Sequence, residues 1–439
     1  MKRHLQLELL LCMLAGHGCN IISFSYGVLQ VYVYSYMRQY DPTLTMKHLH
    51  LHLPLLIGVA ASTSWVQGYL ARWFGPRALH CANMSALCGW CVLLFWFSHS
   101  YAAVTGAMAG IGLSYGMLHV YLISTVVNRV VRYPSLASGI YGVFFGMSGI
   151  WGSILGSTFL NPSNVAKHNI NSSDGDYIFT ETRVLERVPY VWLIIAGLMF
   201  IFLFPALLFV GPEEKQAEAE DESDVKSPKS STSCLPCGTP DNHMEELIPL
   251  QSKETSKQVL VTLLFGSGVT VGVSSLCSFD LYKDFALKLP MYDESDIFLN
   301  NFGIALPVIG ALGRLGWGVV GDYLPVWALL IVENGVTAIL QVLMYVTRPE
   351  REVYVVVCGL LAVTTGMMNV IPPIIKRHIG PENLARNFGF VFSGEVVACL
   401  WYVVFISLVD GIPDAIIVWI LSVPAIVALI AAIFLIGRY

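Results

Sequence analysis

Long apolar stretches alternate with short polar breaks along this chain of 439 residues. A helix needs about 20 apolar residues to cross the hydrocarbon core of a membrane, and each stretch is near or above that length. The stretches span residues 7–36, 53–71, 79–98, 101–126, 136–159, 189–210, 258–287, 297–321, 325–346, 353–375, 387–408 and 413–436. The pattern predicts an all-α membrane protein with twelve transmembrane helices.

One hydrophilic segment divides the predicted helices into two sets. Residues 211–257 are acidic, rich in Ser and Pro, and follow no apolar period. This composition predicts a disordered cytoplasmic linker, because the segment holds too little apolar surface to form a core. We therefore expect an N-terminal six-helix bundle at 1–210 and a C-terminal six-helix bundle at 258–439.

Three glycines of the first half recur in the second half at one ungapped offset. The pairs, each separated by 250 positions (318 − 68, 366 − 116 and 389 − 139), are Gly68 and Gly318, Gly116 and Gly366, and Gly139 and Gly389. A parallel repeat of two six-helix units is typical of a large class of secondary transporters.

The composition supports a membrane location. The chain is 55% hydrophobic and 13% charged, with a mean hydropathy of +0.64, whereas soluble domains hold about 25% charged residues. The net charge of −5 says little, because much of the acid lies in the predicted linker. We find no phosphate-binding glycine loop, no metal-ligand cluster and no paired nucleophile and base, so we expect no enzyme activity, no cofactor, no metal and no nucleic-acid partner.

The short loops indicate an orientation. Segments 71–77, 128–132 and 374–386 are compact and basic, which places them in the cytoplasm together with both termini. Segment 160–188 then lies outside, where Asn171 begins an Asn-Ser-Ser glycosylation signal. A glycosylated multi-pass protein is more readily expected in the plasma membrane than in an internal one.

Four motifs resemble those of the major facilitator superfamily, and within it the branch of oxalate/formate antiporters and monocarboxylate transporters. They are GYLARWFGPRAL between helices 2 and 3, VVNRVVRYPSLASGIYGVFFGMSG at the helix 4–5 junction, GRLGWGVVGDYL between helices 8 and 9, and RHIGPENLARNFGFVFS at the helix 10–11 junction. The resemblance implies the major facilitator fold and secondary transport of small organic anions by alternating access, as a proton symporter or an antiporter.

The same resemblance implies which residues control the conformational change. These gating residues are Gly68, Arg72, Arg77, Gly318 and Asp322. This chain departs from the family pattern at two positions. An acid is usual where Arg72 stands, and oxalate exchangers carry a lysine where Glu395 stands, so oxalate exchange is disfavoured.

Arg314 interrupts the apolar run 297–321. An arginine at the centre of a spanning helix costs roughly 2.5–3.5 kcal/mol and normally faces a partner or a water-filled cavity. Asp322, eight residues further on, marks the expected helix end, so Arg314 lies about 12 Å inside it. Glu333 and Glu395 stand at a similar depth. Adjacency along the chain favours Glu333 as the partner of Arg314, and the family's helix arrangement favours Glu395.

This charge pattern predicts a coupling mechanism. A guanidinium offers two parallel hydrogen bonds that match a carboxylate. A small organic anion entering the cavity would bind Arg314 and release Glu395, which would then take up a proton. The related monocarboxylate carriers use an arginine on helix 8 with an acid one turn earlier. Gly310 stands at that position here, so the proton-carrying role moves to Glu395, with Glu333 as the second candidate.

His119, Asn369 and His17 complete the predicted substrate-binding set. Asn369 is the repeat equivalent of His119 (369 − 119 = 250) and precedes Pro372 and Pro373, which predict a kink. His17, flanked by Gly16 and Gly18, could titrate near neutral pH, although a histidine in a helical bundle is more often a hydrogen-bonded packing residue.

Two other functions share this architecture. The solute could be an amino acid or a sugar-like molecule instead of a monocarboxylate, or the chain could be a non-transporting sensor or scaffold. A channel is disfavoured by the repeat and by the absence of charged rings. The sequence gives no sign for or against an accessory membrane subunit.

Overall fold

The computed structural model describes residues 2–163, 165, 168–171, 176–209, 253–281, 296–347, 349–408 and 414–436. Most of the predicted linker lies outside these residues. Helix α13 already begins at Lys253, earlier than the predicted start of the second half at 258. The domain boundaries stay a prediction.

The first half of the chain forms the following elements: α1 (Lys2–Cys19), α2 (Ile21–Arg38), α3 (Met46–Leu49), α4 (His52–Thr63), the 3-10 turn η1 (Ser64–Val66), α5 (Gln67–Phe74), α6 (Pro76–Phe97), α7 (Tyr101–Arg129), α8 (Pro134–Met147), α9 (Ile150–Ile154), the π-helical turn η2 (Leu155–Leu160), α10 (Thr182–Leu185) and α11 (Val188–Phe209). Strands β1 (His168–Asn171) and β2 (Asp176–Ile178) pair antiparallel, with His168 opposite Ile178. The sequence did not indicate this hairpin.

The second half forms α13 (Lys253–Leu276), the π-helical turn η3 (Cys277–Leu281), α15 (Asp296–Gly321), α16 (Val326–Val346), α17 (Arg351–Thr364), the 3-10 segment η5 (Thr365–Asn369), α18 (Ile371–His378), η6 (Pro381–Asn383), α19 (Leu384–Phe392), α20 (Gly394–Leu408) and α21 (Asp414–Ile436). Eleven spans of the described residues are long and apolar enough to cross a membrane. Helix α21, apolar over Ile420–Phe434, supplies the twelfth. Helices dominate because a chain in lipid must satisfy its backbone hydrogen bonds within each segment.

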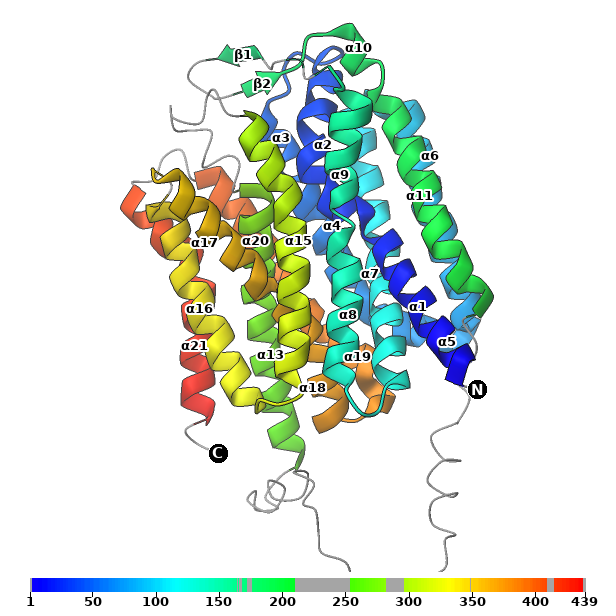
Figure 1. The fold of residues 1–439 in the computed structure, drawn as a ribbon, viewed down its shortest axis with the longest axis vertical. Helices are drawn as coiled ribbons and strands as arrows, with labels where there is room; N and C mark the ends of the chain where they lie inside the picture. Colours follow the sequence, from blue (N-terminus) through cyan, green and yellow to red (C-terminus); the bar gives the residue numbers. More distant parts are fainter. Residues whose placement is uncertain are drawn as a thin grey trace, which may run out of the picture.

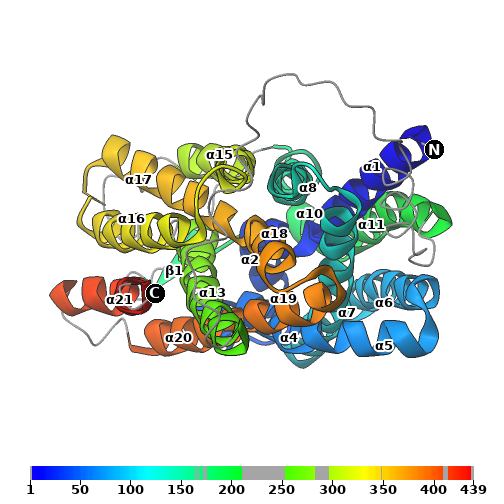
Figure 2. The same ribbon diagram turned by 90° about the horizontal axis from the view of Figure 1, so that it is seen from below.

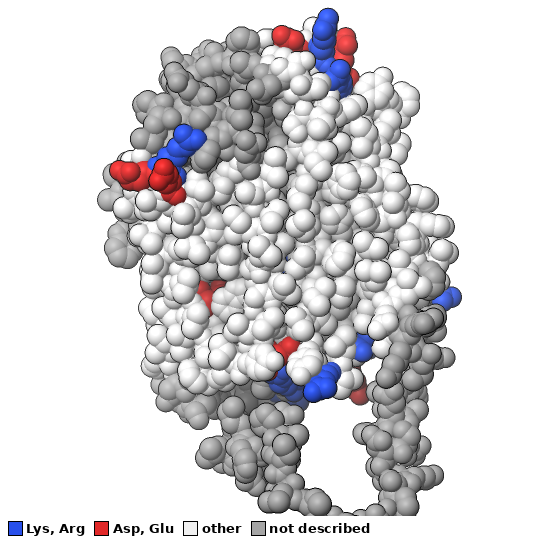
Figure 3. All heavy atoms as spheres, in the orientation of Figure 1, with Lys and Arg blue, Asp and Glu red and all other residues white. Residues whose placement is uncertain are grey.

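The elements form an elongated molecule with two groups of helices side by side. The start of α1 and the end of α21 lie at one end, here named the terminal end, and the β1–β2 hairpin lies at the opposite end (Figure 1). Seen along the long axis, α13, α16, α17, α20 and α21 lie on one side, and α1, α5, α6, α7 and α11 on the other (Figure 2). On the face drawn in Figure 3, charged atoms gather mostly near the two ends, and the broad band between them is largely uncharged apart from one acidic group. That band matches the hydrocarbon core of a bilayer.

Glycine lets helices of the two halves approach closely. A Cβ added at Gly139 in α8 would stand 2.9 Å from Gly318 Cα in α15, and one added at Gly389 in α19 would stand 2.7 Å from Trp65 Cα in η1. Gly139 and Gly389 are a pair of the 250-residue repeat. The repeat therefore places equivalent glycines at equivalent contacts between the halves.

Asp322 joins the two halves at the terminal end. It follows α15 directly, and its carboxylate accepts backbone N–H bonds from Ser135 (3.1 Å) and Leu136 (2.9 Å) in the first turn of α8. Its Oδ1 also lies 3.5 Å from Arg377 Nη2 in α18. A negative charge is favourable at a helix N-terminus, where backbone N–H groups lack partners within the helix.

Lys376 makes a second contact between the halves at this end. Its Nζ donates to the carbonyl oxygens of Val127 (2.8 Å), Asn128 (3.3 Å) and Val130 (3.0 Å) at the end of α7. A cation at a helix C-terminus satisfies carbonyls that have no partner within the helix. The terminal end is therefore closed by polar contacts across the two halves.

Candidate functional site

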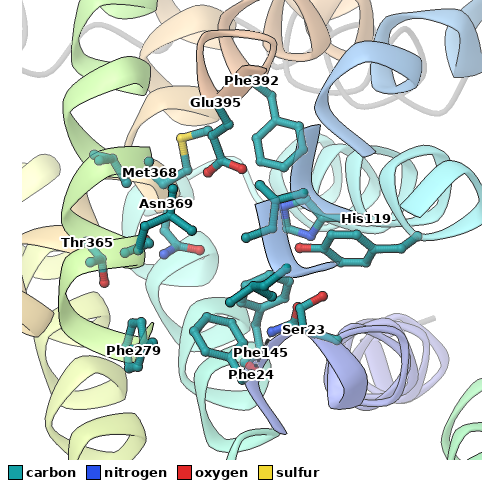
Figure 4. Close-up of a pocket in the computed structure, with 18 of the residues that line it drawn as sticks. Ser23, Phe24, His119, Phe145, Phe279, Thr365, Met368, Asn369, Phe392 and Glu395 are labelled. Carbon is teal, nitrogen blue, oxygen red and sulfur yellow. Dashed lines mark hydrogen bonds between the residues drawn. The ribbon is translucent and has the colours of Figure 1, made fainter. Parts of the chain in front are cut away.

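A cavity lies between the two halves of the chain, and Figure 4 shows residues that line it. The first half contributes residues of α2, α4, α7 and α8, and the second half contributes residues of α13, η3, α15, η5, α19 and α20. Four of the predicted site residues line the cavity: His119, Arg314, Asn369 and Glu395.

Arg314 is only 3% exposed and is held by aromatic rings instead of an acid. Its Cζ lies 5.3 Å from the ring centroid of Phe24 and 5.9 Å from that of Phe145. The two rings meet edge to face, with their centroids 5.6 Å apart. Aromatic faces attract a guanidinium through their quadrupole, which lowers the cost of burying it.

The guanidinium of Arg314 retains an unused hydrogen-bond donor. Nη1 is buried without a hydrogen-bond partner, and no carboxylate of the described residues lies within 4 Å of it. Arg314 is therefore paired with neither Glu333 nor Glu395 in this structure. A buried cation with an unpaired donor at a cavity wall is suited to bind an anion.

Glu395 stands on the other side of the cavity. It lies in the first turn of α20, directly after the chain breaks its helix at Ser393, and it is 9% exposed. In Figure 4 its carboxylate points into the space between the labelled residues, opposite Phe24 and Phe145, which flank Arg314. Within the described residues it makes no hydrogen bond or ion pair, so the cavity holds an unpaired cation and an unpaired carboxyl group on opposite walls.

His119 and Asn369 also line the cavity, on either side of the space into which Glu395 points (Figure 4). His119 Nδ1 lies 3.0 Å from the Tyr141 hydroxyl, and its ring contacts Phe145 of the first half and Phe392 of the second, with centroids 4.6 Å and 5.5 Å apart. Asn369 makes one long bond of 3.5 Å, from Nδ2 to the carbonyl of Gly366. Its amide therefore has hydrogen-bonding capacity left for a bound molecule.

Helix irregularities coincide with the cavity. The first span breaks between α1 and α2 at Asn20, and η3, η5 and the α19–α20 break all carry cavity-lining residues. Irregular backbone within a membrane is tolerated where it is buried in protein or lines a cavity. The two prolines at 372–373 predicted a kink in the tenth span, and η5 lies immediately before them.

Comparison with solved structures identifies the architecture. The chain superposes on the crystal structure of the human organic anion transporter MFSD10 (TETRAN) with a TM-score of 0.62, at 12% identity, over 98% of this chain and 99% of that one. The chain has the major facilitator fold. No protein-family model matches the sequence, and no curated protein sequence matches it either.

The major facilitator fold confirms the predicted twelve-helix architecture. The narrower resemblance, to the oxalate/formate and monocarboxylate branch, stays a prediction. In this fold the cavity lies between the two halves, and binding near the bilayer midplane is general among transporters with internal repeats.

His17 does not line this cavity. Its Nδ1 lies 2.7 Å from the carbonyl oxygen of Phe144, and its Nε2 lies 2.8 Å from the indole nitrogen of Trp151. Because an indole N–H only donates, Nε2 accepts and Nδ1 carries the proton. Both nitrogens of a neutral ring are used, so His17 packs α1 against α8 and α9, and we leave it out of the proposed site.

Glu333 also stands apart from the cavity. Helix α16 packs against α13, α17 and α21, and Glu333 is fully buried. A lone acid in an apolar helix does not reveal which neighbour it faces, and the choice between Glu333 and Glu395 by chain adjacency could not be made from sequence.

The predicted gating residues fall into two groups. Gly318 and Asp322 lie at contacts between the halves. A Cβ at Gly68 in α5 would have no neighbour within 4 Å, and Arg72 and Arg77 are exposed at the terminal end of α5 and α6. Asn171 is the last residue of β1, at the end of the molecule opposite the termini (Figure 1), and its side chain lies outside the described part.

Sequence reasoning did not identify the aromatic residues that hold Arg314. Phe24 and Phe145 lie in apolar helices where any phenylalanine could as well face lipid. Only the fold brings α2, α8 and α15 together around the cavity. The one sequence signal beside these rings is Gly146, a residue that leaves room for a bulky neighbour. The structure shows that the neighbour is Arg314, because a Cβ at position 146 would overlap its guanidinium.

Proposed function

We propose that this protein carries small organic anions across a membrane by alternating access, with Arg314 as the carboxylate-binding residue. The observation that carries the proposal is the buried guanidinium, which has an unpaired Nη1 at the wall of a central cavity. The major facilitator fold supports transport as the activity. The fold is shared with a human organic anion transporter, which is consistent with an anionic solute.

The chemistry of the cavity favours a carboxylate with an apolar body. A carboxylate would accept two parallel hydrogen bonds from the guanidinium. The rest of the solute would lie against apolar side chains, among them Leu53, Ile57, Phe279 and Phe392. We assign Glu395 the coupling role: its carboxyl group takes up one proton when the anion binds, so loading adds no net charge to the carrier.

The proposed orientation places the terminal end in the cytoplasm, following the basic loops. With this orientation, the contacts of Asp322 and Lys376 would close the cytoplasmic side, and this structure would correspond to a state closed toward the cytoplasm. The β1–β2 hairpin with Asn171 would face outside, in the plasma membrane.

Uptake into proteoliposomes tests the function. We expect saturable uptake of labelled lactate and of its aromatic analogue phenyllactate. Phenyllactate should half-saturate uptake at a lower concentration than lactate, because its phenyl ring is buried against the apolar wall. An inward proton gradient should accelerate both. Protein-free liposomes are the control. A non-transporting sensor or scaffold would show no saturable flux of either anion above this control.

An amino acid is the second candidate solute. The observation that favours it is the unpaired Glu395 across the cavity from Arg314, because a zwitterion presents a carboxylate and an ammonium group together. Competition decides between the two: phenylalanine would inhibit phenyllactate uptake more strongly than phenyllactate itself only if the cavity is built for a zwitterion.

Asp322→Asn should favour the state open at the terminal end. The substitution keeps the size of the side chain but removes the charge that the N-terminus of α8 stabilises, a loss of about 1 kcal/mol, or roughly fivefold in the equilibrium. The check is the rate at which a maleimide labels Ser138→Cys in α8, which is fully buried here, in a background without other accessible cysteines. We expect faster labelling with Asp322→Asn. An unchanged rate would show that Asp322 does not hold this end closed.

A further inference from the structure

A second buried polar cluster lies between α13 and α16, away from the central cavity. On α16 it contains Glu333, Asn334, Thr337 and Gln341, and on α13 it contains Ser267, Thr270 and Ser274, all of them 1% exposed or less. Residues 333, 337 and 341 recur every four positions, so they share one face of α16. We name these seven residues the α13–α16 seam.

Asn334 fixes the two helices in register. Its Nδ2 donates to Ser267 Oγ (2.9 Å) and to the carbonyl of Leu330 (2.8 Å), and its Oδ1 accepts from Thr270 Oγ1 (2.8 Å). Gln341 Nε2 makes a weaker contact of 3.5 Å with Ser274 Oγ. These bonds satisfy both amide donors of Asn334 and one of Gln341.

The remaining unsatisfied groups of the seam are all oxygen atoms. Both carboxyl oxygens of Glu333, Oγ1 of Thr337 and Oε1 of Gln341 are buried without a hydrogen-bond partner. No described cation lies within 4 Å of Glu333. A carboxylate ion cannot remain in such a place without a partner, because the desolvation of an unpaired charge is far more costly than its neutralisation.

In the described residues, the helices that pack against α16 bring no cation close enough to neutralise Glu333. On α13 the charged residues are Lys253, Glu254 and Lys257, all within its first five residues, and on α17 they are Arg351 and Glu352, its first two residues. The other titratable residues of α17 are Tyr354 and Cys358. The one charged residue within α21 is Asp414, its first residue.

We propose that Glu333 is a second proton-binding site of this protein, separate from the central cavity, and that it holds its proton while α13 and α16 are packed as in this structure. A proton needs no cavity. It neutralises Glu333, and its O–H adds a donor to a seam in which four oxygen atoms have no hydrogen-bond partner. Loss of the proton would place a bare charge between the two helices and drive them apart.

Helix α13 connects this site to the central cavity. Ser267, Thr270 and Ser274 face the seam, whereas Val271, Gly272 and Ser275 of the same turns line the cavity. A Cβ at Gly272 would stand 3.2 Å from Glu395 Cγ, so the backbone of α13 lies directly against Glu395. If deprotonation of Glu333 shifts α13, the shift would therefore also move Glu395, on the cavity wall opposite Arg314.

Infrared spectroscopy of the purified full-length protein tests this proposal without any transported solute. A protonated carboxyl group has a C=O stretching band that ionised carboxylates lack. At neutral pH we expect a buried-carboxyl band that Glu333→Gln removes, both alone and in a Glu395→Gln background. Glu350→Gln, which replaces an exposed glutamate, and Thr337→Val should both keep the band.

Two outcomes overturn the proposal. If Glu333→Gln leaves every carboxyl band unchanged, Glu333 is ionised. If the band disappears at constant pH when NaCl replaces choline chloride, the seam binds a metal cation instead of a proton. Should Glu333→Gln fail to fold, ¹³C-glutamate labelling of Glu395→Gln provides the same test: a buried-carboxyl band that shifts with the isotope supports the proposal, and its absence refutes it.

Discussion

Arg314→Lys should reduce lactate uptake at least about tenfold, and Arg314→Gln about a hundredfold or more. Lysine keeps the charge but loses the planar pair of donors and the stacking on Phe24 and Phe145. Glutamine loses the charge as well, and removal of one partner from a buried charged pair costs roughly 2–5 kcal/mol. The measurement is the initial rate of labelled lactate uptake into proteoliposomes at matched protein density.

Arg183→Lys is the matched control, because Arg183 is exposed in α10. A second variant keeps the guanidinium but displaces it: a Cβ at position 146 overlaps Nη1 of Arg314, so Gly146→Val should also abolish most uptake. Wild-type rates in Arg314→Lys would contradict the assignment of Arg314 to the anion.

Glu395→Gln should uncouple uptake from the proton gradient. Glutamine matches the size of the glutamate but cannot exchange a proton, so the variant can no longer take up a proton with the anion. We expect the stimulation by an inward proton gradient to disappear, while exchange of lactate against internal lactate continues at a measurable rate. Exchange needs no net proton movement, and it therefore also controls for folding.

The coupling assignment has a clear counter-result. If Glu395→Gln retains the full response to the proton gradient, another group carries the coupled proton, and Glu333→Gln becomes the variant to compare. If neither variant changes the response, proton coupling through these two residues is refuted.

The sequence was sufficient for the architecture because lipid imposes strict rules on it. Each spanning helix needs an apolar stretch of a known length, and the glycine repeat related the two halves. The depth of Arg314 also followed from helix geometry, since α15 ends at Gly321, next to the predicted marker Asp322.

The partners of Arg314 could not be predicted in the same way. The depth of a residue follows from counting, but the direction in which it points depends on how each helix is rotated and packed. Glu333 and Glu395 were predicted at a similar depth, so depth alone could not show which of them is the partner of Arg314. The fold turns Glu333 toward the α13–α16 seam and Glu395 toward the cavity, and it places two phenylalanines where an acid was expected. The helix break at Asn20 likewise depends on a distant segment, because the Asn20 amide donates to the Phe145 carbonyl and to Ser148 Oγ.

Equilibrium binding of benzoate and benzamide to the purified protein tests the central claim most directly, because the two molecules share a ring and differ in charge. We predict that wild-type protein binds benzoate about tenfold to a hundredfold more tightly than benzamide, as expected for a hydrogen bond to a charged group. In Arg314→Gln this preference should vanish. A preference for benzoate that persists in Arg314→Gln would contradict the account, since the negative charge would then be recognised elsewhere.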